Sequence, residues 1–175
     1  MTTPTFFRQS NENTLTSYNY IDIADGTGVQ TFYALHSYTN SGAAYFLSSQ
    51  ADYGSDEVIT ATDVDIDLTP FNIPRDATGI ANINFYGRMS GGGTTRWWAQ
   101  LSKVSGGVET PMGSGTSGTY PGDIQIILKI PITDTHFVKG DVLRLTIMHS
   151  GTGTSSYYIS ASKPIKINVP FKINL

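Results

Sequence analysis

The side chains best suited to acid–base or metal chemistry in this chain are three histidines, His36, His136 and His149. His36 and His149 lie within or at the end of strand-like patterns, and His136 lies in a predicted loop. No two of them have the spacing that places two metal ligands on one element. We therefore expect structural histidines with satisfied hydrogen bonds, and the sequence predicts no metal site.

A second candidate is the alternating run of Asp63, Asp65 and Asp67. A calcium loop of the EF-hand type also needs glycine at its sixth position and glutamate at its twelfth. Those positions hold Leu68 and Pro74, so the motif fails. We interpret the three carboxylates as the wet face of a strand, where charge discourages edge-to-edge pairing. An adventitious cation site is the alternative.

Motifs for nucleophilic catalysis and phosphate binding are missing. The Gly91-Gly92-Gly93 segment lacks the Gly-Lys-Ser/Thr ending of a phosphate loop, and no serine lies in a Gly-x-Ser-x-Gly elbow. Cupin barrels gather several histidines, whereas the three here are scattered. The paired carboxylates of a glycosidase remain an open alternative, although only three glutamates occur. The sequence thus predicts no catalytic residue, no cofactor and no enzyme.

Two outward-facing aromatic residues favour binding over catalysis. In the strand pattern at 96–104, Arg96 and Trp98 share the face that points away from the core. Tyr158 likewise alternates outward in the pattern at 156–161. Exposed aromatic rings stack on sugars or anchor protein interfaces. Trp98 is therefore a candidate for a subunit interface or a ligand platform, unless a second sheet or a loop covers it.

Strands must position these residues, because apolar and polar residues alternate from about Tyr18 to the C-terminus. Roughly ten such runs, separated by turn residues and without a convincing helix, predict an all-β sandwich or barrel. We predict a loop over 111–122, which is rich in Gly, Ser and Thr. Residues 165–173 read as an extended edge strand, since Pro and Lys discourage pairing. Pairing with a neighbouring subunit is the alternative for that strand.

The N-terminal segment differs from the rest of the chain. Residues 1–17 are polar and aperiodic apart from Phe6, Phe7 and Leu15. We predict an N-terminal arm over 1–17 and a single domain over 18–175, which is long enough for a substantial core. The arm is either a frayed terminus or a docking arm that inserts Phe6 and Phe7 into a neighbouring molecule.

Charge and composition exclude several classes of partner. The net charge is −3 and Lys and Arg do not cluster, which argues against nucleic-acid binding. No apolar stretch approaches the roughly 20 residues that cross a bilayer, and the N-terminus has no secretory signal. The chain has no cysteine, which favours synthesis in a reducing cytoplasm. Thr, Ser, Asn and Tyr take the place of charged residues on the surface.

Part of the strand series resembles single jelly-roll proteins of virus and phage particles, such as minor capsid, decoration and head-fibre proteins. The resemblance covers about residues 57–160. It is carried by segments 80–86, 97–104, 106–110, 126–131 and 136–147, the last of which contains Phe137-Val138-Lys139-Gly140-Asp141.

The resemblance implies a single jelly-roll β-sandwich of two antiparallel sheets and carries no catalytic residues. It implies a non-enzymatic structural protein of the virion that forms a homo-oligomer, with a trimer favoured, and binds the major capsid protein. A carbohydrate-binding or receptor-binding module, with a surface glycan as its ligand, is the alternative.

Overall fold

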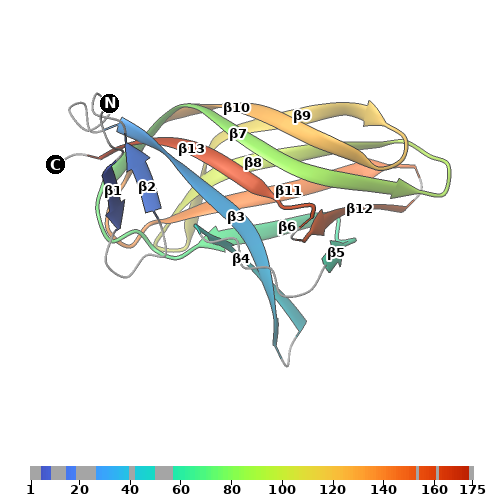
Figure 1. Cartoon of the computed structure of the whole chain (residues 1–175), viewed down its shortest axis with the longest axis horizontal. Helices are drawn as coiled ribbons and strands as arrows, with labels where there is room; N and C mark the ends of the chain where they lie inside the picture. The colour runs from blue at the N-terminus through green and yellow to red at the C-terminus, as the bar shows by residue number, and fades with distance from the viewer. Residues whose placement is uncertain are drawn as a thin grey trace.

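The computed structural model describes residues 5–8, 15–18, 27–39, 42–49, 57–152, 154–160 and 162–173. These residues form strands joined by turns, as the alternation predicts (Figure 1). The strands are β1 (Thr5–Arg8), β2 (Leu15–Tyr18), β3 (Thr27–Thr39), β4 (Gly42–Ser48), β5 (Glu57–Ile59), β6 (Asp63–Leu68), β7 (Arg75–Ser90), β8 (Thr95–Ser105), β9 (Val108–Tyr120), β10 (Ile124–Phe137), β11 (Val142–Gly151), β12 (Thr154–Ile159) and β13 (Lys166–Ile173). Within these ranges there is no helix long and apolar enough to cross a membrane.

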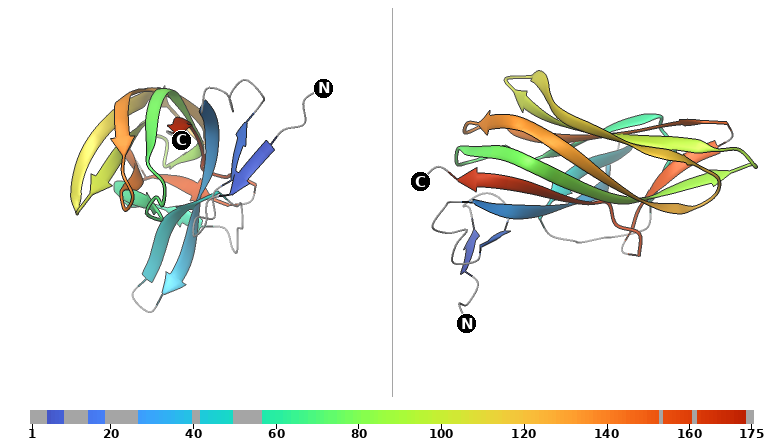
Figure 2. Two further views of the ribbon diagram at one scale, coloured as in Figure 1. Left: turned by 90° about the vertical axis from the view of Figure 1, so that its left-hand side faces the viewer. Right: turned by 90° about the horizontal axis from the view of Figure 1, so that it is seen from above.

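The strands form one continuous sheet that rolls around a single core. Its order is β10-β7-β13-β3-β4-β6-β11-β8-β9. In addition, β12 pairs with the C-terminal end of β7, and β5 pairs with β12. The end-on view in Figure 2 shows how the sheet curls over itself. Every pairing between the described strands is antiparallel except the short parallel contact between β4 and β6.

The prediction of two separate sheets is wrong in this respect, and the reason lies in β3. This strand pairs with β13 through Thr27–Tyr33 and with β4 through Tyr33–Thr39. One long strand therefore belongs to both layers and carries the hydrogen-bond ladder around the corner. Beyond that corner, the hairpin of β3 and β4 extends away from the body of the molecule (Figures 1 and 2).

The segment predicted as a loop over 111–122 is largely strand β9, which pairs with β8. Its glycines serve the closure of the roll, where β9 meets β10. A Cβ atom at Gly113 would lie 2.2 Å from the carbonyl oxygen of Pro131, and one at Gly115 would lie 3.1 Å from Ile130. Glycine here permits the close approach of two backbones, a role that composition alone does not separate from a flexible loop.

The C-terminal strand is not at an edge, contrary to the prediction. β13 lies between β7 and β3 and pairs with both. Its ladder with β7 shifts register between Asn168 and Phe171, and Pro170 lies in that irregularity. A bulge tolerates proline because no donor is needed there. The pairing partners of this strand are thus within the chain itself.

The core lies between the two layers of the roll. Alternate residues of β7, β8, β10 and β11 are fully or almost fully buried, which is the period of two that the sequence predicts. Trp97 is the largest of the fully buried side chains. A Cβ atom at Gly87 would lie 2.6 Å from the Trp97 indole, so Gly87 on β7 makes room for the ring. This contact fixes one layer against the other beneath the outward face of β8.

Part of the predicted N-terminal arm is strand. β1 and β2 pair with each other, and β2 adds to β3 through Thr16 and Ser17. Phe6 and Phe7 lie in β1. Their side chains are outside the described part of the structure, so their docking role remains a prediction.

Candidate ligand-binding site

The candidate site begins with three adjacent strands, β6, β11 and β8, whose register aligns their outward residues in rows. Asp67 lies opposite Arg144, which lies opposite Ser102. Residues directly opposite one another on neighbouring strands have interacting side chains. Two further rows follow along the strands, first Asp65, Thr146 and Gln100, and then Asp63, Met148 and Trp98.

Arg144 is the shared cation at one end of this surface. Its guanidinium donates to Asp67 through Nε at 2.7 Å and Nη2 at 2.9 Å, and Nη1 donates to Asp65 at 2.9 Å and Glu109 at 3.0 Å. Thr146 also donates to Asp65 at 2.6 Å. The hydrogen bond to Asp67, with the nearby carboxylate charges, raises the pKa of Arg144 despite its partial burial. Each of the three carboxylates therefore has a hydrogen-bonded cationic partner, although one guanidinium does not cancel all three charges.

The prediction that the aspartates protect a sheet edge is therefore wrong. β6 lies between β4 and β11 and is not an edge strand. Its alternation is as predicted, with Asp63 and Asp65 exposed and Ile66 and Leu68 buried on the other face. Among the residues described, no group of three His, Asp or Glu side chains is arranged to hold a metal ion.

Asp63 differs from its two neighbours because it makes no hydrogen bond or ion pair with the described residues. It lines a hollow of about 400 Å³ together with Thr62, Trp98, Met148 and His149. We call this the Asp63 hollow. It combines a free carboxylate, a half-buried indole ring and a thioether.

A second hollow, of about 310 Å³, adjoins the first and shares Thr62 and His149 with it. We call it the Ser155 hollow. Its remaining lining is Gly151 and four hydroxyl-bearing residues, Thr60, Ser150, Thr154 and Ser155. The main-chain amide of His149 donates to the carbonyl of Thr62 at 3.0 Å, which attaches the segment before β6 to β11. Close backbone contact supports the same region, since a Cβ atom at Gly151 would lie 2.2 Å from the Thr94 carbonyl oxygen.

His149 and Ser155 form a buried pair at the base of the second hollow. Ser155 Oγ lies 2.6 Å from His149 Nδ1, and the side chains of both residues are almost fully buried. Burial lowers the pKa of His149 and outweighs the backbone of Ala61, which acts in the opposite direction. The imidazole is therefore neutral at pH 7. It is a hydrogen-bonding base and not a fixed charge.

Two buried polar atoms lie beside this pair. Trp97 Nε1 and the Tyr157 hydroxyl make no hydrogen bond with the part of the chain that the structure describes. Trp97 lies opposite His149 on the neighbouring strand, and the rings of His149 and Tyr157 meet edge to face at 6.0 Å. Burial, and then the charges of Tyr45 and Asp63, raise the pKa of Tyr157. Such groups carry a desolvation penalty.

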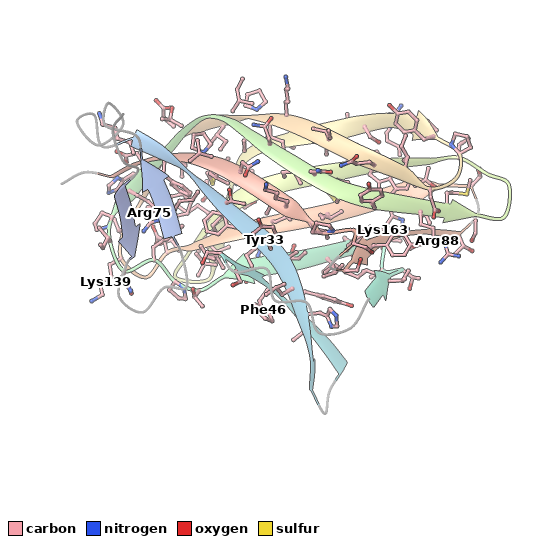
Figure 3. The ribbon with its side chains drawn as sticks, viewed as in Figure 1. Tyr33, Phe46, Arg75, Arg88, Lys139 and Lys163 are labelled. Carbon is pink, nitrogen blue, oxygen red and sulfur yellow. The ribbon has the colours of Figure 1, made fainter. Side chains whose placement is uncertain are left out.

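The structure separates the binding residues that the sequence suggested. Trp98 is half-buried and Arg96 is exposed, both on the outward face of β8 as predicted. Arg96 lies one row beyond Trp98, opposite Ser150, and does not line either hollow. Tyr158 is half-exposed on β12, where the ammonium group of Lys163 lies 4.0 Å from its ring centroid. Lys163 is labelled in Figure 3. Tyr158 is thus remote in topology from the site around Trp98.

One of the histidines departs from the sequence analysis. His136 lies in β10 and not in a loop, and its Nδ1 is 2.5 Å from Asp76 Oδ1 across the ladder with β7. His149 is buried and hydrogen-bonded, as expected of a structural histidine, and it also lines both hollows. Neither Met148 nor Ser155 was singled out, because the register that brings them to the site is not visible in the sequence.

Comparison with known proteins gives similarity in fold alone. No family model and no curated protein matches the sequence. A CocE/NonD family hydrolase from Staphylococcus aureus superposes with a TM-score of 0.63 at 12% identity, over 85% of this chain and 37% of that one. An α-amino acid ester hydrolase gives 0.62 at 13% identity, over 81% and 36%. An aminopeptidase from a marine sediment Thaumarchaeota archaeon gives 0.55 at 11% identity, over 63% and 26%. The chain spans little more than a third of those chains at most.

These structures overturn the expectation of a non-enzymatic structural protein of a viral particle, because the folds that this chain resembles belong to hydrolases. They also conflict with the prediction that it is no enzyme. The virion resemblance was based on the series of strands, and β-sandwiches of unrelated function share such a series. Self-association and a surface glycan as ligand remain predictions. What the chain is similar to is the β-rich part of certain hydrolases.

Proposed function

We propose that this chain is a β-sandwich binding domain of the kind found in hydrolases, and that its Asp63 hollow binds a small organic amine. The observation that supports this is the carboxylate of Asp63, which has no hydrogen-bond or ion-pair partner among the described residues and is aligned in one row with Met148 and the indole of Trp98. A protonated amine is attracted both to a carboxylate and to the face of an indole ring. The thioether of Met148 is an adaptable apolar contact for the rest of such a ligand.

The surrounding charges favour the same ligand class. Arg144 compensates Asp65 and Asp67 but does not reach Asp63. The protein has a net charge of −3, which favours the approach of a cation over an anion. The name of one similar structure, an α-amino acid ester hydrolase, denotes a substrate built on an α-amino acid. A compound of that kind carries an amine, and the analogy adds support at the level of the fold alone.

The topology supports a finer description of the fold. We infer that the rolled sheet is a jelly roll. The supporting features are the strand order, in which β7 and β8 lie in opposite layers, and the meeting of β9 with β10 at the edge of the roll. In such a domain the outward face of β6, β11 and β8 remains available for binding.

The test compares benzylamine with the neutral isostere benzyl alcohol by NMR titration, which detects weak binding. We expect the amine to shift resonances around Trp98 and to bind about fivefold more tightly than the alcohol, which corresponds to about 1 kcal/mol. Asp63→Asn should remove that preference. The matched variant Asp65→Asn, on the same strand and face, should retain it. Equal binding of amine and alcohol to the unmodified protein, or an equal loss in both variants, would refute the proposal.

A further inference from the structure

Amine binding makes no use of the buried pair of Ser155 and His149 in the neighbouring hollow. From its geometry we propose that Ser155 is a nucleophile toward activated acyl groups, with His149 as its general base. The Ser155 Oγ is 2.6 Å from His149 Nδ1, within the 2.6–3.2 Å range expected for a nucleophile and its base. Among the described residues, no carboxylate is hydrogen-bonded to His149. The two residues therefore form a catalytic dyad and not a triad.

The surroundings suit this chemistry in two respects. First, the imidazole is neutral, because its burial lowers its pKa, and it can therefore accept a proton at neutral pH. The tautomer that carries its proton on Nε2 leaves Nδ1 as the acceptor for the serine hydroxyl. Second, both residues line a hollow of about 310 Å³, which has room for a small acyl group beside the hydroxyls of Thr60 and Thr154.

The reaction is an ordinary acyl transfer. Ser155 Oγ attacks the carbonyl carbon of an ester while its proton passes to His149 Nδ1. The bond between the carbonyl carbon and the alcohol oxygen breaks, and the alcohol leaves with the proton that His149 holds. An acyl-serine remains. Attack by water on that ester then releases the acid and returns the proton to Ser155, so that no further reactant is needed.

A purely structural role predicts a different outcome. In that case the hydrogen bond from Ser155 would serve only to satisfy one nitrogen of a buried imidazole and to connect β12 to β11. The serine would then be no more reactive than any other hydroxyl group. Ser114 provides the internal standard, because it is an exposed serine on β9 that lines neither hollow.

The experiment incubates the full chain with p-nitrophenyl acetate, follows release of p-nitrophenolate, and maps the acetyl group by peptide mass spectrometry. We expect a burst of about one equivalent, acetyl on Ser155, and at least a tenfold loss of the burst in Ser155→Ala, with Ser114→Ala within twofold of the unmodified protein. The burst rate should fall as acid protonates the imidazole. This compound has no amine, so the result is independent of the proposed amine site.

Acetylation confined to lysine or to other hydroxyl groups would overturn the proposal, and so would an unchanged burst in a folded Ser155→Ala. If Ser155→Ala does not fold, the test relies on the acetylated residues that peptide mass spectrometry identifies in the unmodified protein. Acetyl on Ser155 supports the proposal, and its absence refutes it.

Discussion

Asp63 and Asp67 belong to one strand and one face, yet they have opposite electrostatic environments. Asp67 receives two hydrogen bonds from Arg144, and Asp65 shares the same guanidinium. Asp63 lies two residues before Asp65 on β6. It has no such partner among the described residues and lies beside Trp98 and Met148 instead. A charge whose partner is part of the fold contributes to stability. A charge with no partner, placed beside an aromatic ring in a hollow, is available to a ligand.

The largest effect should come from removing the common partner of the compensated end. Arg144→Met keeps much of the side-chain volume but leaves three neighbouring carboxylates without their cation. We expect a loss of about 2–3 kcal/mol in the free energy of unfolding, measured by urea denaturation at pH 7. A loss below about 0.5 kcal/mol would mean that the bonds from Arg144 do not stabilise the fold, and that Asp67 and Asp63 do not differ in their contribution to stability.

Asp141 gives a second, acid-sensitive test of a compensated carboxylate. Burial raises its pKa, but hydrogen bonds from Ser105, the Val138 amide and Lys103, together with the Lys103 charge, more than offset this, so its pKa is lowered. A carboxyl group whose pKa is lower in the folded state stabilises the protein above the pKa of the unfolded chain, about 3.9, and loses that effect as pH falls through the folded value.

Asp141→Asn should therefore lower the free energy of unfolding by about 1–2 kcal/mol at pH 7. The difference from the unmodified protein should shrink as the pH falls below about 3.9. Thermal unfolding across this range of pH measures it. A difference that stays constant down to pH 2 would show that packing, and not charge, accounts for the role of Asp141.

The direct comparison within β6 should give a smaller effect. Asp65→Asn weakens the bonds from Arg144 and Thr146, and we expect a loss of about 1 kcal/mol in the free energy of unfolding. The same measurement on Asp63→Asn should show no loss. If Asp65→Asn proved as harmless as Asp63→Asn, the hydrogen bonds to Asp65 would contribute nothing to stability.

The sequence predicted the faces of the strands but not their neighbours. A period of two is enough to turn Trp98 outward and to place Asp63, Asp65 and Asp67 on one face. It contains no information on register, and register decides that Asp63 meets Met148 and Trp98 while Asp67 meets Arg144. These residues are up to 85 positions apart in the chain. The candidate site therefore follows from long-range pairing that local patterns cannot predict.

Glycine and proline account for the errors in the fold. Gly113 and Gly115 were assigned to a loop because glycine has a low propensity for strands, whereas close packing against β10 requires them. Pro170 suggested an edge strand, whereas it lies at an irregularity of an interior strand. In both cases a residue type has two structural uses, and only the tertiary neighbours distinguish them.

The smallest expected change in stability is the one that best separates Asp63 from Asp65, because replacing Asp63 should stabilise the protein whereas replacing Asp65 should destabilise it. Asp63 precedes Asp65 by one alternation and has no compensating bond among the described residues, so removing its charge relieves repulsion. We expect Asp63→Asn to raise the free energy of unfolding by a few tenths of a kcal/mol at low salt, and the gain to disappear at about 1 M NaCl, where the Debye length is about 3 Å. Such a gain would show that Asp63 does not stabilise the fold, as the proposed amine site requires. A stability loss in Asp63→Asn would instead make all three aspartates structural and would remove the basis for an amine site.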